Sequence, residues 1–265
     1  MSLLSAAQGV LLDLDGTLFR GEEAIPGAVA FMETLQALEK PFLYWTNNST
    51  RSPKEVAAHL EGLGFAAKPE QVYTSSQALI DLLAERLDEG DPVYVVGEQG
   101  LQTAVREAGW RDLAHMEAAT DESAKAVLVG LDRTSSYQSL AGALTHLLRG
   151  ADFYATNNDR VLPTHRGLMP GAGAVLAFLE TAALRSAKIA GKPSADFVTT
   201  AAGRLGIDAK ETLVVGDNLL TDVLAAKRAG SIGVWVCTGV PGDVAELPLA
   251  ERPDYTIQRL LELLA

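Results

Sequence analysis

Two aspartates, Asp13 and Asp15, stand two positions apart directly after an apolar run at 10–12. An Asp-x-Asp-Gly sequence is by itself a common turn, because Asp bonds to its own backbone and Gly16 supplies a positive φ. Two carboxylates at the end of a buried strand can also bind a hard cation, attack an electrophile or transfer a proton. The pair alone therefore leaves a structural and a chemical interpretation open.

Three further polar clusters stand at the ends of other segments. They are Thr46-Asn47-Asn48-Ser49, Gly191-Lys192-Pro193-Ser194, and Gly216-Asp217-Asn218 followed by Asp222. Each could be a capped loop, a turn or a solvated lysine. In an open parallel sheet, however, ligands bind outside the carboxyl ends of the strands, so four separated clusters can meet in one crevice.

Short apolar runs alternate with longer helical patterns along the chain. The runs are 10–14, 42–45, 93–96, 127–129, 153–155, 213–215 and 234–236. This alternation is typical of an α/β fold, with a mostly parallel sheet and crossover helices. The pattern predicts one helix that begins at Pro53 and ends near Gly62 or Gly64, and another that follows Asn218 and ends before Gly230.

Composition excludes several classes of protein. The chain has 265 residues, 48% of them hydrophobic, which suits a large α/β domain or a core with an inserted module. A net charge of −12 without a Lys/Arg cluster argues against binding to nucleic acid or to an anionic membrane. Cys237 is the only cysteine, so an intrachain disulfide is excluded, and we expect this thiol to be buried. Residues 1–8 lack the features of a signal peptide and no apolar run is long enough for a membrane span, which predicts a soluble, cytoplasmic protein.

Taken together, the four clusters resemble the motifs of the haloacid dehalogenase superfamily of phosphohydrolases. The nucleophile loop corresponds to 13–17, the second motif to Thr46, the third to Lys192 and the acidic motif to 216–222. Segments 94–98, 152–157 and 170–174 are similar to the NagD-like, para-nitrophenyl phosphatase branch, so the resemblance covers nearly the whole chain.

The resemblance implies a doubly wound, Rossmann-like parallel-sheet core with an inserted α/β cap. The stretch between Thr46 and Lys192 is too long for a single crossover connection and long enough for such a cap. We expect the cap at about 82–186, and a discontinuous catalytic core at 1–81 and 187–265.

A phosphatase site must neutralise negative charge, and hard oxygen ligands on Asp13 and Asp217 are suited to hold one Mg²⁺. The family pattern adds the backbone carbonyl of Asp15 as a ligand. Asp13 is then the expected nucleophile, which forms an aspartyl-phosphate, and Asp15 the expected acid and base.

Other residues are expected to bind the substrate or to support the site. Thr46, with Asn47 and Asn48 after it, is expected to donate to the phosphoryl oxygens, and Lys192 to supply a positive charge to nucleophile and phosphate. The expected supporting residues are Gly16, Thr17, Asn218 and Asp222, of which Asp222 orients Lys192 or a metal-bound water and Gly16 makes the sharp turn.

Three alternatives compete with a phosphatase. A haloacid dehalogenase would use Asp13 without needing Asp15 or a metal, and a phosphoaspartyl receiver module would leave the long insertion unexplained. A retaining glycosidase would need its two carboxylates on opposite sides of a sugar, and it has no use for Lys192.

The expected partner is a small phosphorylated metabolite. A sugar phosphate, phosphoglycolate, pyridoxal phosphate and a nucleoside monophosphate all stay open, because cap loops decide between them. His165 and Arg166 could face the substrate from the cap or lie in a solvated loop. Members of the branch often pair through apolar cap surfaces, so the resemblance makes a homodimer the candidate assembly.

Overall fold

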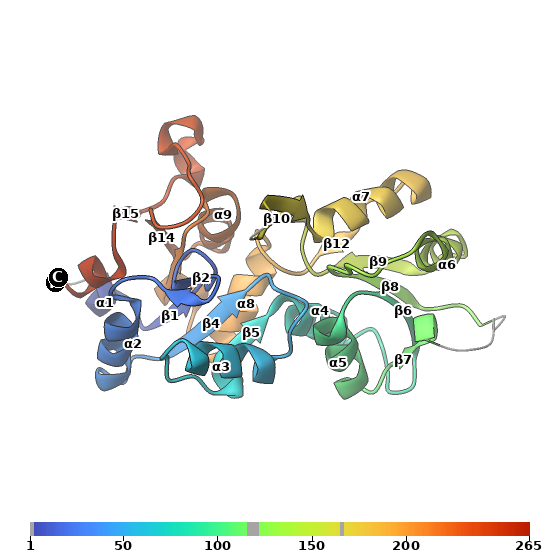
Figure 1. Ribbon diagram of the computed structural model, residues 1–265, viewed down its shortest axis with the longest axis horizontal. Helices are drawn as coiled ribbons and strands as arrows, with labels where there is room; N and C mark the ends of the chain where they lie inside the picture. Colours follow the sequence, from blue (N-terminus) through green and yellow to red (C-terminus); the bar gives the residue numbers. More distant parts are fainter. Residues whose placement is uncertain (1–2, 116–121, 165–166) are drawn as a thin grey trace. The chain divides into compact units, whose positions relative to one another are not determined.

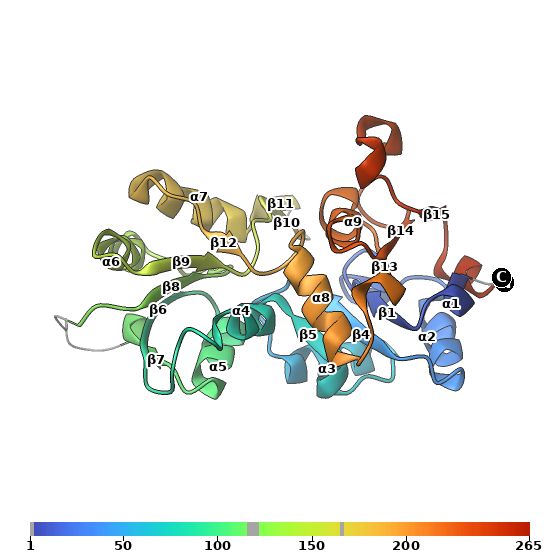
Figure 2. The ribbon, with the colours of Figure 1, turned by 180° about the vertical axis from the view of Figure 1, so that it is seen from behind.

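The computed structural model describes residues 3–115, 122–164 and 167–265, which form two compact units (Figures 1 and 2). The first unit comprises Met1–Thr46, Pro53–Tyr73 and Lys192–Ala265, and the second comprises Asn47–Ser52 and Thr74–Gly191. The segment 82–186 lies inside the second unit, together with residues on either side of it and the short stretch after Thr46.

The first unit is built on a six-stranded sheet in the order β15-β14-β13-β1-β4-β5. Its strands are β1 (Gly9–Leu12), β4 (Phe42–Thr46), β5 (Val72–Thr74), β13 (Thr212–Gly216), β14 (Ile232–Val236) and β15 (Tyr255–Ile257). Strand β1 lies in the interior and pairs in parallel with β4 on one side and β13 on the other. Strands β4 and β5 follow β1 on one side, and β14 and β15 follow β13 on the other, so the strand order reverses between β1 and β13. The sheet therefore has the predicted doubly wound topology, with its ligand-binding switch point between these two strands.

Helices cover both faces of this sheet. On one face, α2 (Ala28–Ala37) and α3 (Pro53–Gly62) share a core with alternate residues of β1 and β4; this core includes Val10, Leu12, Phe31, Met32, Phe42, Tyr44, Val56 and Leu60. On the other face, Phe197 of α8 (Ala195–Arg204) packs on Trp45 and Tyr73, with ring centroids 4.8 Å and 5.1 Å away. Strands buried on both faces explain why the sequence shows continuous apolar runs here.

The remaining elements of the first unit are short. They are α1 (Leu3–Ala6), α9 (Leu224–Ala229), the antiparallel pair β2 (Phe19–Arg20) and β3 (Glu23–Ala24), and the 3₁₀ helices Pro69–Gln71, Ala209–Glu211, Val244–Glu246, Leu249–Glu251 and Leu260–Leu264. The helix predicted after Asn218 begins with a π-helical turn, Leu219–Val223, before α9. Asn218 caps it by accepting from the Leu220 N–H at 2.9 Å, and Gly230 ends it with φ 74°, as predicted.

The second unit has its own five-stranded parallel sheet, in the order β12-β9-β8-β6-β7. Its strands are β6 (Pro92–Val96), β7 (Arg111–Asp112), β8 (Ala126–Val129), β9 (Asp152–Ala155) and β12 (Lys188–Ile189). Helices α6 (Tyr137–Leu148) and α7 (Ala172–Ala183) lie on one face, while α4 (Ser75–Leu83) and α5 (Gln99–Glu107) lie on the other (Figure 1). The unit also holds the 3₁₀ helix Leu113–His115 and an antiparallel pair, β10 (Val161–Thr164) and β11 (Gly167–Pro170). In the described part of the chain, no helix combines the length and apolar character needed to cross a membrane.

Candidate active site

A buried ammonium group lies at the centre of the site. Lys192 is 2% exposed, and its Nζ is 2.5 Å from Oδ1 of Asp13 and 2.6 Å from Oδ1 of Asp222. The same Nζ lies 4.3 Å from the centroid of the Trp45 ring. Asp13 directly follows β1, and its N–H donates to the carbonyl of Val215 in β13, so the strand pairing places this carboxylate at the switch point.

A third carboxylate, from Asp217, completes an acidic cluster. Asp13, Asp217 and Asp222 are all buried, and each offers a carboxylate oxygen within 4.8 Å of the other two. When ionised, three carboxylates against the one ammonium of Lys192 leave an excess of negative charge in a dry site. Such an excess, carried by hard oxygen donors, fits a divalent cation such as Mg²⁺.

The ionisation of these groups follows from their crowding. Burial raises the pKa of Asp13 well above its ordinary value; Lys192 opposes this rise, while Asp222 and Asp217 add to it. Burial and the charge of Asp222 raise the pKa of Asp217 to about 7. Burial lowers the pKa of Lys192, but Asp13 and Asp222 outweigh it and hold the pKa above its ordinary value. The ammonium therefore stays charged, while Asp13 and Asp217 need a further cation to ionise fully at neutral pH.

The loop after β1 wraps closely around these carboxylates. Gly16 has φ 84°, and a Cβ there would lie 2.4 Å from Oδ2 of Asp217, so the predicted sharp turn requires a residue without a side chain. Thr17 donates its hydroxyl to Oδ2 of Asp13 at 3.1 Å, and the hydroxyl of Thr238 donates to the carbonyl of Gly16 at 2.6 Å. The loop conformation and the carboxylate orientation are thus fixed together.

A segment that was not predicted from the sequence holds Asp217 in place. The N–H of Val240 donates to Oδ2 of Asp217 at 2.7 Å, and Trp235 donates its Nε1–H to the Asp217 carbonyl at 2.8 Å. A Cβ at Gly239 would lie only 1.8 Å from Oδ2 of Asp217. The signal was available, because Gly239 follows the carboxyl end of β14 at the same edge of the sheet as Asp13.

The other predicted residues lie in different surroundings. Asp15 has an exposed side chain on the same loop as Asp13, and Thr46 is a buried residue at the carboxyl end of β4, the neighbour of β1. Asn47 and Asn48 belong to the second unit, where Asn47 donates to Oδ2 of Asp159 at 3.1 Å and Oδ1 of Asn48 accepts from the N–H and hydroxyl of Thr50. Their predicted contact with substrate stays a prediction.

His165 and Arg166, which could face the substrate, lie outside the described residues.

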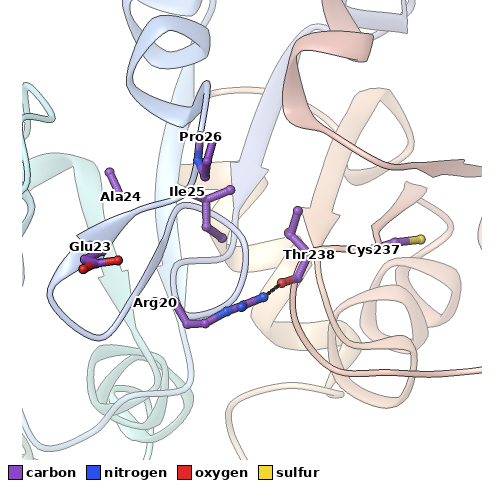
Figure 3. A pocket seen from close by; sticks show the side chains of 7 residues that line it. All are labelled: Arg20, Glu23, Ala24, Ile25, Pro26, Cys237 and Thr238. Carbon is purple, nitrogen blue, oxygen red and sulfur yellow. Dashed lines mark hydrogen bonds between the residues drawn. The ribbon is translucent and has the colours of Figure 1, made fainter.

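A cavity of about 350 Å³ lies beside the β2–β3 pair (Figure 3); it is lined by Arg20, Glu23, Ala24, Ile25, Pro26, Cys237 and Thr238. Arg20 donates to the carbonyl of Thr238. The hydroxyl of Thr238 in turn donates to the carbonyl of Gly16. The pair is therefore tied to the loop around the carboxylates. Cys237, just past the end of β14, was expected to be buried, but it is only partly buried, packed against the cluster of Leu219, Val223 and Trp235.

Two family models and several known proteins are similar to this chain. The family described as haloacid dehalogenase-like hydrolase matches residues 10–111, and the family described as HAD-hydrolase-like matches residues 189–263. The 5′-nucleotidase YutF of Bacillus subtilis is 37% identical over 96% of both chains.

Two solved structures are also similar over nearly the whole chain. The glycerol phosphate phosphatase of Mycobacterium tuberculosis in complex with magnesium is 39% identical, with a TM-score of 0.89 over 99% of this chain and 78% of that one. A thermostable NPPase double mutant of Geobacillus stearothermophilus is 40% identical, with a TM-score of 0.87 over 98% of both chains.

Binding of Mg²⁺ should depend on pH through Asp217. Since protons on Asp217 and on Asp13 compete with the cation, the affinity for Mg²⁺ should rise at least about tenfold per pH unit below pH 7. The raised pKa also means that the folded, metal-free protein holds a proton that the unfolded chain has lost, so its stability should fall as pH rises towards 7. Calorimetric titration and thermal unfolding at pH 5.5 and pH 8 test both effects. Equal Mg²⁺-induced shifts in Tm at the two values would contradict this view of the site.

Replacing Gly239 with Ala should weaken the metal site, since the new methyl group would overlap Oδ2 of Asp217. Groups that orient a ligand are typically worth about 10- to 100-fold in metal affinity, and we expect a loss in that range by calorimetry. Gly203→Ala on α8 is the matched control, because nothing lies within 4 Å of a Cβ added there. An unchanged Kd for Mg²⁺ in Gly239→Ala would show that this close approach is unimportant.

Proposed function

This chain belongs to the haloacid dehalogenase-like hydrolases, and on that premise we propose that it is a Mg²⁺-dependent phosphatase of small phosphate monoesters. The observation that carries the proposal is the ammonium of Lys192 between Asp13 and Asp222, 2.5 Å and 2.6 Å away, beside the third carboxylate of Asp217. Relatives named as phosphatases, one of them solved with magnesium, support the same conclusion.

The residues that would hold Mg²⁺ are Asp13 and Asp217, with the main-chain carbonyl of Asp15 as a third ligand. The ion would supply positive charge against both the carboxylates and the substrate phosphate. Asp222 does not need to be a ligand, because Oδ1 pairs with Lys192 and Oδ2 accepts the N–H of Asn218 at 3.0 Å. Its role in the proposal is to orient Lys192.

In the first half of the reaction, a carboxylate oxygen of Asp13 attacks phosphorus, and the bond from phosphorus to the alcohol oxygen breaks. Lys192 and Thr17 fix the Asp13 carboxylate in one orientation, which favours in-line attack. Asp15, an exposed residue on the same loop, gives its proton to the departing alcohol.

In the second half, Asp15 takes a proton from water while the water attacks the phosphorus of the aspartyl-phosphate. The bond between phosphorus and the Asp13 oxygen breaks, and phosphate leaves. Thr46 and the main-chain amides of Asn47 and Asn48 donate to the phosphoryl oxygens throughout, and Lys192 balances their charge.

The second unit is the proposed cap, which decides which phosphate ester enters. The relatives' names cover a nucleotidase, a glycerol phosphate phosphatase and an acid sugar phosphatase, so they agree on phosphate monoesters and differ in the alcohol. A small phosphorylated metabolite is therefore the substrate class that we propose. A homodimer stays a prediction.

The alternatives explain the site less well. Dehalogenation needs a carboxylate nucleophile but no cluster of three acidic groups, and a glycosidase has no role for a lysine held between two aspartates. A receiver module needs only one of the two units.

Replacing Asp13 with Asn should remove nearly all phosphatase activity while the fold is kept, because the amide is a poor nucleophile. The assay is release of phenol from para-nitrophenyl phosphate, with Mg²⁺ and with excess chelator, and circular dichroism checks the fold. The wild type should be active only with Mg²⁺. Hydrolysis by Asp13→Asn within about tenfold of wild type would rule out the covalent route.

Replacing Asp15 with Asn should separate the two halves of the reaction. An acidic phenol leaves without a proton, so para-nitrophenyl phosphate should still load Asp13, whereas an alkyl phosphate should not. Rapid quench should show a burst of phenol near one equivalent of enzyme, followed by a steady rate about 10²- to 10⁴-fold below wild type. Equal slowing of both esters with no burst would move the acid–base role to another group.

A further inference from the structure

The main-chain carbonyl of Asn47, the residue after Thr46, accepts two hydrogen bonds from side chains. Ser75 donates its hydroxyl to this oxygen at 2.7 Å, and Asn157 donates from Nδ2 at 2.8 Å. Ser75 is 0% exposed and Asn157 is 4% exposed, so neither bond competes much with water. All three residues belong to the second unit.

The donors of these bonds are themselves held in place. The N–H of Asp159 donates to Oδ1 of Asn157 at 3.1 Å, which directs the Nδ2 group of Asn157 towards Asn47. The side chain of Asn47 in turn donates to Oδ2 of Asp159 at 3.1 Å. Asn47 is thus fixed at both its main chain and its side chain.

The residue before Lys192 packs on the same group of residues. The N–H of Gly191 donates to the carbonyl of Thr156 at 2.8 Å, and a Cβ at Gly191 would lie 2.5 Å from Oδ1 of Asn47 and 3.0 Å from Cβ of Ser75. Thr46–Asn47 and Gly191–Lys192 are two of the four places where the chain passes from one unit to the other. Two residues of the proposed active site are therefore each bonded covalently to a residue in this cluster.

Fixing a carbonyl also fixes the amide on the other side of the same peptide. A trans peptide is planar, and its C=O and N–H point in opposite directions, so the N–H of Asn48 points away from Ser75 and Asn157. Hydrogen bonds accepted by the carbonyl also polarise the peptide and make this N–H a stronger donor.

We propose that Ser75 and Asn157 are positioning residues that aim the main-chain N–H of Asn48 at the phosphoryl group of the substrate. The inference rests on the proposed function, in which the amides after Thr46 donate to the phosphoryl oxygens. It adds that the aim of the Asn48 donor is set by the second unit, by residues that do not themselves contact the reacting atoms.

Ser75→Ala tests the proposal with little change of shape. Charge on the phosphoryl oxygens must be met by aligned donors in the transition state, so loss of alignment should lower kcat by about tenfold and leave KM within about twofold. Ser76→Ala is the matched control, because Ser76 is a buried serine on the same helix whose hydroxyl donates to the carbonyl of Ser49 instead, at 3.3 Å. Its kcat should stay within about twofold of wild type, although both variants lose one buried hydroxyl.

Asn157→Asp is an independent variant that keeps the size of the side chain but removes the Nδ2 donor. It should lower kcat in the same way as Ser75→Ala. Asn158→Asp, an identical change at the exposed neighbour, controls for the added negative charge and should have little effect.

A measurement without turnover reads the Asn48 amide itself. Hydrogen–deuterium exchange of this amide should slow when inorganic phosphate and Mg²⁺ are added to the wild type, and should slow much less in Ser75→Ala. If the wild type hydrolyses para-nitrophenyl phosphate but Ser75→Ala and Ser76→Ala have equal kcat, or phosphate leaves the exchange at Asn48 unchanged, the positioning role is wrong. If the wild type hydrolyses no phosphate ester, the proposed function is wrong and the inference falls with it.

Discussion

The site depends on one buried ammonium group shared by two carboxylates. Removing Lys192 from water costs several kcal/mol unless opposite charges replace the lost hydration, and Asp13 and Asp222 provide them. The three partners come from distant parts of the chain: one follows β1, one follows β13, and Lys192 follows β12. They can meet only if β1 and β13 are neighbours in the sheet. The charge balance of the site therefore requires the strand order to reverse between these two strands. Asp217 adds a third carboxylate to the same cluster, and its negative charge can be balanced by a metal ion.

Much of the fold could be predicted because buried parallel strands leave a strong signal. Each of the seven apolar runs overlaps a strand, because the side chains of these strands are covered on both faces. The elements that the sequence did not reveal are short or exposed. All residues of β11 are exposed, β2 and β3 have two residues each, and β15 is exposed in two of its three residues, so no hydrophobic pattern marks them. The π-helical turn after Asn218 was missed because its composition suits an ordinary helix equally well.

The side chains of the candidate site could be predicted, whereas its main-chain partners could not. Asp13 and Asp217 are recognisable from residue type and from their place after apolar runs, and Lys192 is recognisable from the family motif that it matches. The N–H of Val240 donates to Asp217, and Gly239 lies close to the same carboxylate. Both contacts depend on the backbone conformation, which the residue types alone do not determine. The bonds from Ser75 and Asn157 to Asn47 join residues far apart in the sequence, and each of these polar residues alone would be read as a surface position.

The strand order also affects how the chain folds during synthesis. Strand β1 can pair with β4 soon after both leave the ribosome, but its other edge stays open until β13 emerges, after the whole second unit has been made. At about 5–20 residues per second, this interval lasts on the order of ten to thirty seconds. Throughout it, a hydrophobic strand edge is available to other chains, and Asp13 lacks the partners that balance its charge. A nascent chain therefore carries an aggregation hazard at the same strand on which its chemistry will later depend.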